Sequence, residues 1–475
     1  MSDELAGYWY SRFVFERGLA LIYLIGFVVV VNQFIPLLGE RGLLPVPRFV
    51  EAVPFRVSPS LFYFRPTDVV FRIAGWVGIL LSVVALTGIV TRHSVVGGAV
   101  VWALLWVLYL SFVNVGQTFY GFGWESLLLE LGFFTIFAGA STTPTPALLN
   151  WMYRWTLFRL MFGAGLIKLR GDTCWRDLTC LDYYFETQPI PNALSWYFHW
   201  LPRPVLHGGV AFNHFVELLV PFGYFLPQPF AGIAGLITIV FQLTLIVSGN
   251  LSWLNWLTIV LAFTTLDNRF LSWLPITLPA LQPLPVIQRW AVYGLAALVA
   301  ILSISPVVNM LSPNQVMNTS FNPLQIVNTY GAFGSITRER YEIVIEGTTE
   351  AAPSESTVWR EYEFKGKPGN PARRPTQIAP YHLRLDWLMW FAAMGPSGEQ
   401  EWFSPLIAKL LQGDKATIGL LTNDPFPNDP PRWIRARLYR YTFTTREQHA
   451  QTGRWWNRTL VSDYLPPVQL RQRPS

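Results

Sequence analysis

The feature that most constrains this chain is a series of apolar segments, each close to the length needed to cross a lipid bilayer. A membrane-spanning helix needs about 20 mostly apolar residues. Charged residues make up only 13% of the sequence, well below the roughly one-quarter typical of soluble domains. We therefore predict a multi-pass membrane protein with about nine spans: Phe13–Ile35, Val69–Val90, Val95–Val115, Leu127–Ala140, Leu148–Leu169, Val205–Leu226, Ala231–Val247, Leu251–Leu266 and Trp290–Val308.

Hydrophobicity falls abruptly after Val308, and this change divides the chain. Ser312–Ser335 is rich in Asn, Ser, Pro and Gly, as loops are. Segments with the alternation of β-strands follow, together with segments that suit short helices: Tyr341–Ile345, Trp359–Phe364 and Ile434–Phe443, then Tyr381–Ala393 and Phe403–Leu411. The sequence thus predicts an all-α polytopic membrane bundle over residues 1–308, followed by a β-rich soluble domain over residues 309–475.

The net charge of +6 comes mainly from the last third of the chain, for example Arg373 and Arg374. Beside a bilayer, a basic domain is explained more simply by anionic lipid headgroups than by nucleic acid. A basic surface that is merely solvated explains the charge equally well. Membrane lipid is therefore the predicted partner, and nucleic acid is not.

Four charged residues lie where lipid-facing helix is expected. Glu125 and Glu130 lie in or beside the fourth apolar segment, and Arg154 and Arg159 lie in the fifth. A charge at mid-bilayer costs at least about 3 kcal/mol, so such residues normally face the bundle interior and pair. We prefer Glu130 with Arg159. The pair either fixes helix packing as a buried ion pair or belongs to a substrate or proton site.

Lys168 closes the fifth apolar segment. A long amine at a helix end commonly extends to the lipid headgroups. Alternatively, a lysine desolvated in a cavity has a lowered pKa and can serve as a base. Both interpretations of Lys168 remain open.

His207, His214 and Glu217 form another candidate group. The two histidines are seven residues apart and Glu217 follows His214 by three, so all three can face the same side of a helix. This spacing permits a metal site but does not establish one, because no further carboxylate or cysteine set occurs at ligand spacing. Packed, hydrogen-bonded histidines are the alternative, and we predict no metal.

Cys174 and Cys180 are the only cysteines in the sequence. In an oxidising compartment they are expected to form a disulfide that clamps the short loop between them, worth about 2 kcal/mol. The alternative is a thiol pair that exchanges with client proteins, although the spacing is not that of a CxxC redox motif.

Motifs of soluble enzymes are absent from the sequence. There is no GxSxG, P-loop, HExxH or dinucleotide fingerprint. We accordingly predict no cofactor.

Several long blocks of the sequence resemble the lipase maturation factor family: Gly165–Asn192, Tyr120–Glu130, Asn328–Thr348, Tyr362–Gly369 and Pro380–Ala393. The resemblance implies a multi-pass membrane protein, because the animal members of the family lie in the endoplasmic reticulum membrane. It also implies a role in maturation, since those members help secreted dimeric lipases reach an active fold. By the same resemblance, client handling falls to the C-terminal domain.

A shorter block, AGLIKL followed by Trp175, is similar to the membrane domain of vitamin K-dependent carboxylases. In that family a lysine after such a pattern serves as the catalytic base. Lys168 occupies the matching position, so the similarity implies a catalytic role for it. This chain carries a smaller extramembrane portion than those carboxylases.

Two hypotheses of function follow. The leading one is a non-enzymatic folding factor whose β-rich domain and Cys174–Cys180 loop contact secreted clients. The rival is an intramembrane enzyme or small-molecule binder, with Lys168 as base and a cavity lined by further polar residues: Glu130, Arg159, His207 and His214.

The side of the membrane is predicted from two signals that disagree. Lys and Arg counts would place the two long connections, Pro36–Asp68 and Lys168–Pro204, in the cytoplasm. The cysteines favour an oxidising, non-cytoplasmic face for the second connection. We follow the cysteines and predict a non-cytoplasmic C-terminal domain, in the endoplasmic reticulum membrane of a eukaryote or the inner membrane of a bacterium.

Overall fold

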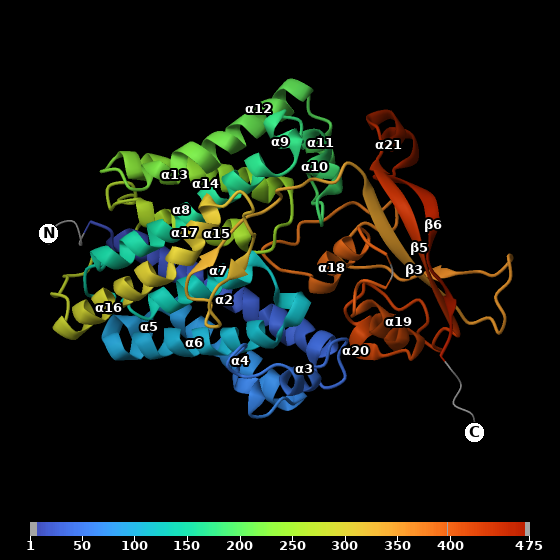
Figure 1. Ribbon diagram of the computed structural model, residues 1–475, viewed down its shortest axis with the longest axis horizontal. Coiled ribbons are helices and arrows are strands. Elements are labelled where there is room, and N and C mark those ends of the chain that lie inside the picture. Colours follow the sequence, from blue (N-terminus) through green and yellow to red (C-terminus); the bar gives the residue numbers. More distant parts are fainter. Residues whose placement is uncertain (1–6, 397, 471–475) are drawn as a thin grey trace.

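The computed structural model describes residues 7–396 and 398–470, so the outer ends of both predicted domains lie outside the described residues. Figure 1 shows a helical bundle on one side and an antiparallel sheet with short helices on the other. The sequence predicts a helical region followed by a β-rich region. The structure has the helical region, and its C-terminal region holds small sheets.

Six helical stretches among the described residues are long and apolar enough to cross a membrane. Two of these stretches join consecutive helices. They are α2 (Trp9–Leu38), α4 (Asp68–Thr87), α6 (Val95–Val115), α12 with η3 and α13 (Arg203–His214, Phe215–Leu219 and Val220–Gly223), α14 (Phe230–Ser248), and α16 with α17 (Val286–Leu302 and Ile304–Leu311).

The expected count of about nine spans is not confirmed. The other three predicted segments correspond to α7 (Gly123–Thr135), α8 (Ala147–Arg170) and α15 (Leu254–Ala262), the last followed by η4 (Phe263–Thr265). Nearly all of α7 and most of α8 are buried by other helices. A helix buried on all sides is apolar for the same reason as a lipid-facing helix, so composition alone does not separate them.

Short helices fill the connections at the end of the bundle that meets the sheet and at the opposite end. They are α3 (Val46–Ala52), η1 (Leu61–Tyr63), α5 (Ile89–His93), η2 (Gln117–Tyr120), α9 (Thr173–Arg176), α10 (Leu181–Thr187) and α11 (Ser195–His199). Helix α2 lies at the centre of the bundle, where it packs against α4, α7 and α15.

The C-terminal sheet has four antiparallel strands in the order β4-β3-β5-β6. The strands are β4 (Arg360–Glu361), β3 (Arg340–Thr348), β5 (Trp433–Phe443) and β6 (Trp456–Val468). The alternation at Tyr341–Ile345 and Ile434–Phe443 predicted β3 and β5. Only two residues of Trp359–Phe364 pair as a strand. Strand β6 was missed, because Pro466 and Pro467 are unusual in a strand and are tolerated here at the sheet edge.

Four short helices accompany the sheet: α18 (Arg384–Ala392), α19 (Phe403–Leu411), α20 (Lys415–Ile418) and α21 (Arg446–Thr452). The first two fall within the segments expected to be helical. Helix α18 packs on β3 and also approaches the bundle at η2.

Residues 312–335, called the joint below, connect the bundle to the rest of the chain up to residue 470, called the C-terminal half below. The joint packs on the bundle. Its short strands β1 (Thr319–Ser320) and β2 (Asn328–Thr329) pair with each other. Gln315 donates to the carbonyl oxygen of Gly163 on α8 at 3.0 Å. A Cβ atom at Gly163 would lie 2.7 Å from the carbonyl oxygen of Tyr330. The joint therefore reaches α8 at a point where only glycine fits.

Candidate functional site

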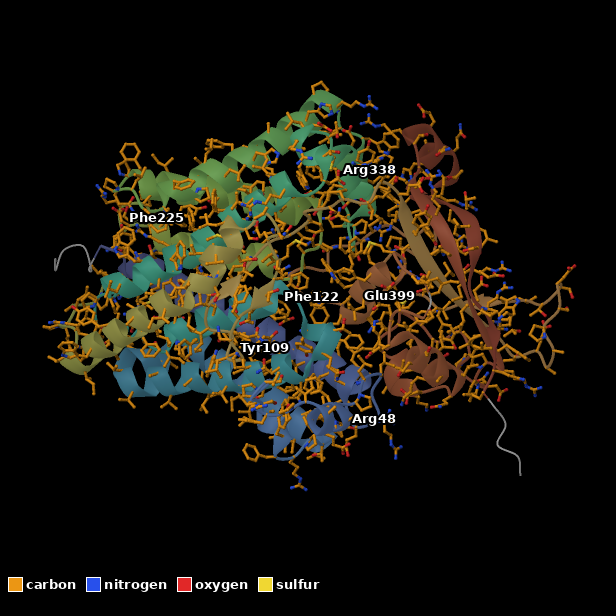
Figure 2. All side chains as sticks on the ribbon, viewed as in Figure 1. Arg48, Tyr109, Phe122, Phe225, Arg338 and Glu399 are labelled. Carbon is orange, nitrogen blue, oxygen red and sulfur yellow. A yellow bond between two sulfur atoms is a disulfide. The ribbon has the colours of Figure 1, made fainter. Side chains whose placement is uncertain are left out.

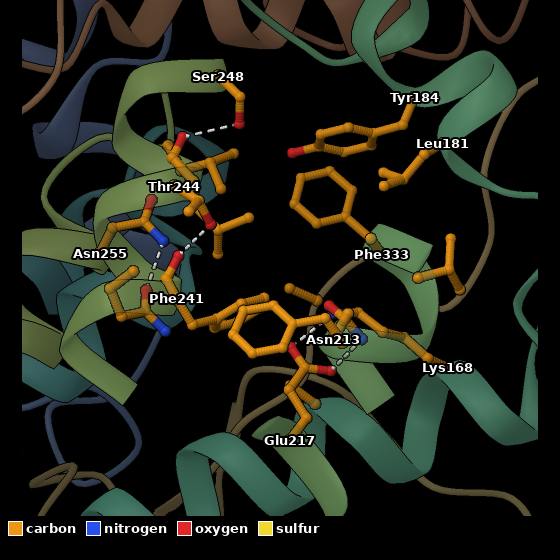
Figure 3. Close-up of a pocket in the computed structure, with 18 of the residues that line it drawn as sticks. Lys168, Leu181, Tyr184, Asn213, Glu217, Phe241, Thr244, Ser248, Asn255 and Phe333 are labelled. Atoms are coloured by element: carbon orange, nitrogen blue, oxygen red, sulfur yellow. Dashed lines mark hydrogen bonds and ion pairs between the residues drawn. The ribbon is translucent and has the colours of Figure 1, made fainter. Parts of the chain in front are cut away.

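A cavity of about 260 Å³ lies in the bundle against α8, between α12 and α14. Helices α10 and α15 and residues 330–333 of the joint complete its walls. Figure 3 shows Lys168, Asn213 and Glu217 together on one side of the cavity, with the Tyr184 ring on another. The cavity is mostly apolar and has one charged corner.

That corner is an ion pair between α8 and η3. The Nζ atom of Lys168 donates to Oε1 of Glu217 at 2.6 Å and to Oδ1 of Asn213 at 2.9 Å. The amide of Asn213 donates in turn to the other Glu217 oxygen at 3.0 Å. Nζ also lies 4.9 Å from the centre of the Trp175 ring. Every charge and most hydrogen-bonding capacity in this corner is thus partnered inside the protein.

Glu217 lies in a π-helical turn, Phe215–Leu219, between α12 and α13. Such turns widen an α-helix locally and recur at functional sites. Along α12 the residues that line the cavity are spaced three or four apart, as expected for one helix face. They are Val205, Leu206, Gly209, Val210, Phe212 and Asn213.

Lys168 is buried and lines the cavity, where its Nζ atom contacts Glu217 and Asn213. The Nζ atom is already held by the Glu217 carboxylate and the Asn213 amide oxygen, whereas a general base must be free to contact its substrate. A catalytic role for Lys168 stays a prediction, and this pairing does not favour it.

Glu130 and Arg159 are in direct contact deep in the bundle, as the preferred pairing expected. The carboxylate also accepts from the Thr156 hydroxyl at 2.7 Å and from the Tyr330 hydroxyl at 2.8 Å. The backbone N–H and side-chain amide of Asn328 donate to it at 3.0 and 3.1 Å. Arg159 donates to the Asn328 carbonyl. This ion pair therefore anchors the joint to α7 and α8.

Glu125 has a different partner, which the sequence did not reveal. Nη1 of Arg384, at the start of α18, lies 2.8 Å from Oε1 of Glu125. The guanidinium carbon is 3.4 Å from the centre of the Tyr120 ring. Tyr109, inside the bundle in Figure 2, donates to the same carboxylate. One arginine of the C-terminal half thus neutralises a buried acid of the bundle.

The remaining polar residues predicted within the membrane have separate partners. Arg154 donates to the carbonyl oxygen of Tyr224 at 3.0 Å. His207 lies 3.6 Å from Asp182, and the Nε2 atom of His214 lies 2.8 Å from the Trp175 carbonyl oxygen.

The structure therefore corrects two expectations about these residues. His207, His214 and Glu217 do not converge, and no group of three or more His, Cys, Asp or Glu side chains able to hold a metal is found in residues 7–396 and 398–470. The lining of the Lys168 cavity also lacks four residues that the enzyme hypothesis placed there: Glu130, Arg159, His207 and His214. Each of those side chains is held by contacts elsewhere.

Cys174 and Cys180 form a disulfide with Cα atoms 4.8 Å apart, and both are buried. Asp172 caps the adjacent helix α9 by accepting from the Cys174 N–H at 3.0 Å, and it pairs with Arg338 at 2.8 Å. Partial burial alone would raise the pKa of Asp172, but these two partners bring it below its ordinary value. Figure 2 shows Arg338 where the bundle meets the sheet. The disulfide loop thus contacts the C-terminal half.

Further contacts join the segment after the disulfide to the sheet. Arg340 on β3 donates to the Pro189 carbonyl at 3.0 Å. The Phe443 N–H on β5 donates to Glu186 at 2.6 Å, and the Trp196 indole donates to the Thr444 carbonyl at 2.9 Å. The disulfide loop, α10, α11 and the C-terminal sheet therefore lie on the same face of the bundle (Figure 1).

Sequence reasoning missed the residues that complete these sites. Asn213 precedes Glu217 by one helical turn, which is a usable signal for a shared helix face. Asn328 and Tyr330 lie within a block already noted for its family resemblance. Arg384 begins a helix whose other residues are apolar except for Asp386, so nothing in the sequence indicated its distant partner Glu125.

Comparison with known proteins matches both halves of the chain. A family model of the lipase maturation factor transmembrane domain matches residues 10–273, and one of the lipase maturation factor C-terminal domain matches residues 326–466. No solved structure matches the chain.

Curated relatives extend over nearly the whole sequence. Lipase maturation factor 1 of Mus musculus is 43% identical over 98% of this chain and 88% of its own length. The Bos taurus protein of that name is 44% identical over 97% of this chain and 89% of its own length. Lipase maturation factor 2 of Xenopus tropicalis is 30% identical over 97% of this chain and 82% of its own length. This multi-pass membrane chain belongs to the lipase maturation factor family.

Proposed function

We propose that this chain is a membrane-anchored factor that helps secreted lipases reach their active fold, without catalysing a reaction itself. Its relatives are named for lipase maturation. The observation that carries the proposal furthest is the joining of the C-terminal half to the bundle through the buried ion pair of Glu125 with Arg384 and through hydrogen bonds such as that from the Phe443 N–H to Glu186. The bundle in this arrangement supports a rigid extramembrane surface for clients.

The disulfide supports a non-cytoplasmic position for that surface. A disulfide persists in an oxidising compartment, and the Cys174–Cys180 loop shares one face of the bundle with the C-terminal half through Asp172 and Arg338. In a eukaryote the surface then lies in the lumen of the endoplasmic reticulum, and in a bacterium it lies outside the inner membrane. Newly exported lipases pass through both places.

Strand β6 is the part of the C-terminal half best suited to contact a client. It is an outer strand of the sheet, and Leu460 and Val461 on it are exposed. An open strand edge with exposed apolar side chains accepts an extended segment of another chain. We propose this edge as the client contact.

The test uses cells that lack their own lipase maturation factors and secrete a lipase reporter. Activity per molecule of secreted lipase is measured with this chain, with Leu460→Glu combined with Val461→Glu, and with Val358→Glu. Val358 is also exposed but lies outside the strands, so it serves as the matched control. We expect the native chain and the control to raise specific activity, and the double variant to lose most of that gain at equal abundance.

Two results would reject parts of this proposal. No gain with the native chain removes the lipase-maturation role. A full gain with the β6 double variant removes the β6 edge as the client contact. Deleting residues 309–475 is a poorer test, because Glu125 and Glu130 would lose partners and the bundle itself would be destabilised.

A further inference from the structure

The cavity beside Lys168 opens sideways, between α12 and α14. Val205 and Phe212 on α12 and Thr244 on α14 line the cavity and are also exposed. Both helices belong to stretches able to cross a membrane. An exposed, partly apolar rim on two such helices offers a path into the cavity for a molecule dissolved in a surrounding bilayer.

The walls select an apolar, slender occupant. They are built mainly from aliphatic and aromatic side chains, among them Leu160, Met161, Leu206 and Phe241. Transfer of a hydrocarbon chain into such a space is favourable. The volume of about 260 Å³ is below the roughly 300–1,000 Å³ of common ligand sites, which suits one aliphatic chain.

Two donors in the cavity have unused capacity. Lys168 has three N–H bonds, of which two point to Glu217 and Asn213. The Tyr184 hydroxyl points into the cavity in Figure 3, and no hydrogen bond to it is found among the described residues. A buried polar group without a partner is costly, so a ligand that satisfies it is favoured.

The acceptors of the charged corner, by contrast, are engaged. Both Glu217 oxygens accept from side chains of the same corner. On the far wall, Asn255 donates to the Gln242 oxygen at 2.7 Å. An occupant whose polar part meets Lys168 therefore presents an acceptor to it.

From this combination we propose that the cavity binds the acyl chain of a lipid that enters from the bilayer, with a carboxylate or ester carbonyl oxygen accepting from Lys168 and Tyr184. A free fatty acid and one chain of a phospholipid both carry this chemistry. The site goes beyond the proposed maturation role and does not depend on it.

The test uses the full chain in lipid nanodiscs with two photoactivatable probes. One is a long-chain fatty acid with a diazirine in its chain, and the other is a phosphatidylcholine that carries the same chain. Cross-linked residues are located by mass spectrometry. Leu160 and Met161 are buried on α8, so labelling there reports entry into the cavity and not contact with the outer lipid surface.

Two tryptophan variants provide the control. Val205 lies at the rim and is 54% exposed, whereas Val240 on α14 is 55% exposed but does not line the cavity. We expect Val205→Trp to reduce α8 labelling at least tenfold and Val240→Trp to leave it unchanged. Tyr184→Phe is expected to weaken competition by unlabelled oleate about fivefold, as for loss of one hydrogen bond.

Each outcome decides the proposal. Labelling of α8 by the fatty acid alone identifies a free acid as the occupant, and labelling by the phospholipid alone identifies a bilayer lipid. Absence of α8 labelling with both probes overturns the proposal. Equal labelling of the Val205→Trp and Val240→Trp variants overturns it as well.

Discussion

Arg159 and Lys168 lie on the same helix, α8, and each pairs with a buried glutamate, but their surroundings differ. The Glu130 carboxylate is surrounded by donors from Thr156, Asn328 and Tyr330 in addition to Arg159. Among the described residues, the Glu217 carboxylate accepts from Lys168 and Asn213 alone, and its corner borders a cavity.

This difference separates a pair that holds the architecture from a pair that forms a site. Replacing a pair whose carboxylate accepts from many donors leaves several buried donors without a partner. Replacing a pair beside a cavity leaves few such donors. Both pairs are charged and buried, so these properties do not separate a structural pair from a binding site. The number of hydrogen bonds that each carboxylate accepts and the presence of a cavity beside it do separate them. Two double variants, one of each pair, test the distinction directly, and variants at Arg384 and His199 are expected to fall between them in effect.

The largest effect is expected when Glu130→Leu is combined with Arg159→Met. The double change removes the charges together but strands the Asn328 N–H, the Asn328 amide and the Tyr330 hydroxyl, each at a cost of about 1–3 kcal/mol. We expect little folded protein. Size-exclusion chromatography of the detergent-solubilised chain gives the folded yield, and a near-native yield would contradict a structural role.

The second effect concerns the ion pair that joins the two halves. Arg384→Met leaves Glu125 charged and buried without its partner, which costs about 3–5 kcal/mol. Adding Glu125→Gln should recover part of that loss, because the stranded charge is removed. Thermal unfolding of the two single variants and the double variant measures the coupling. Simple additivity of the single effects would show that the contact contributes nothing specific.

The third prediction concerns the stability of the folded chain at acidic pH. Burial lowers the pKa of His199, on α11 beside the sheet, to about 4. The folded chain thus binds fewer protons there than the unfolded chain between pH 6.5 and about 4. Stability is full above pH 6.5 and is lost as the pH falls through this window, by at most about 3 kcal/mol.

His199→Gln isolates that contribution. Burial raises the pKa of nearby Glu186, which responds to acid in the opposite sense and is unchanged in the variant. We expect the variant to melt at a temperature less dependent on pH between 6.5 and 4 than the native chain. Identical pH profiles would remove His199 as the acid-sensitive group.

The smallest effect on stability is expected for Lys168→Met combined with Glu217→Gln. Replacing both partners leaves no buried charge, and the glutamine oxygen can still accept from Asn213, so the cost should stay below about 1 kcal/mol. Oleate competition in the labelling assay should nevertheless weaken. A loss of stability as large as that of the Glu130 and Arg159 double variant would erase the distinction between the pairs.

The helical bundle, most of the sheet and the pairing of Glu130 with Arg159 could be predicted from the sequence. They follow from hydrophobic runs, from alternation and from the cost of a lone charge in lipid. The number of spans could not be predicted in the same way, because apolar runs also occur in α7 and α15, which are short helices, and in α8, which contains Arg154, Arg159 and Lys168.

The partners of the site residues were harder to predict because they come from distant parts of the chain. Asn328 and Tyr330 lie in the joint and Arg384 lies in the C-terminal half, far in sequence from Glu125 and Glu130. The cavity is a property of packing, so no local pattern around Lys168 signals it. Its lining draws on α8, α10, α12, α14, α15 and the joint.

Two buried tyrosines give the most direct test of the central claim. The Tyr330 hydroxyl donates to Glu130 at 2.8 Å, whereas the Tyr184 hydroxyl faces the cavity. The measurement is the melting temperature of Tyr330→Phe and Tyr184→Phe with and without oleate, which stabilises the folded state if it binds there. We predict that Tyr330→Phe melts lower but keeps the oleate shift, and that Tyr184→Phe melts like the native chain and loses much of the shift. Equal melting temperatures and equal oleate shifts in the two variants would contradict the account.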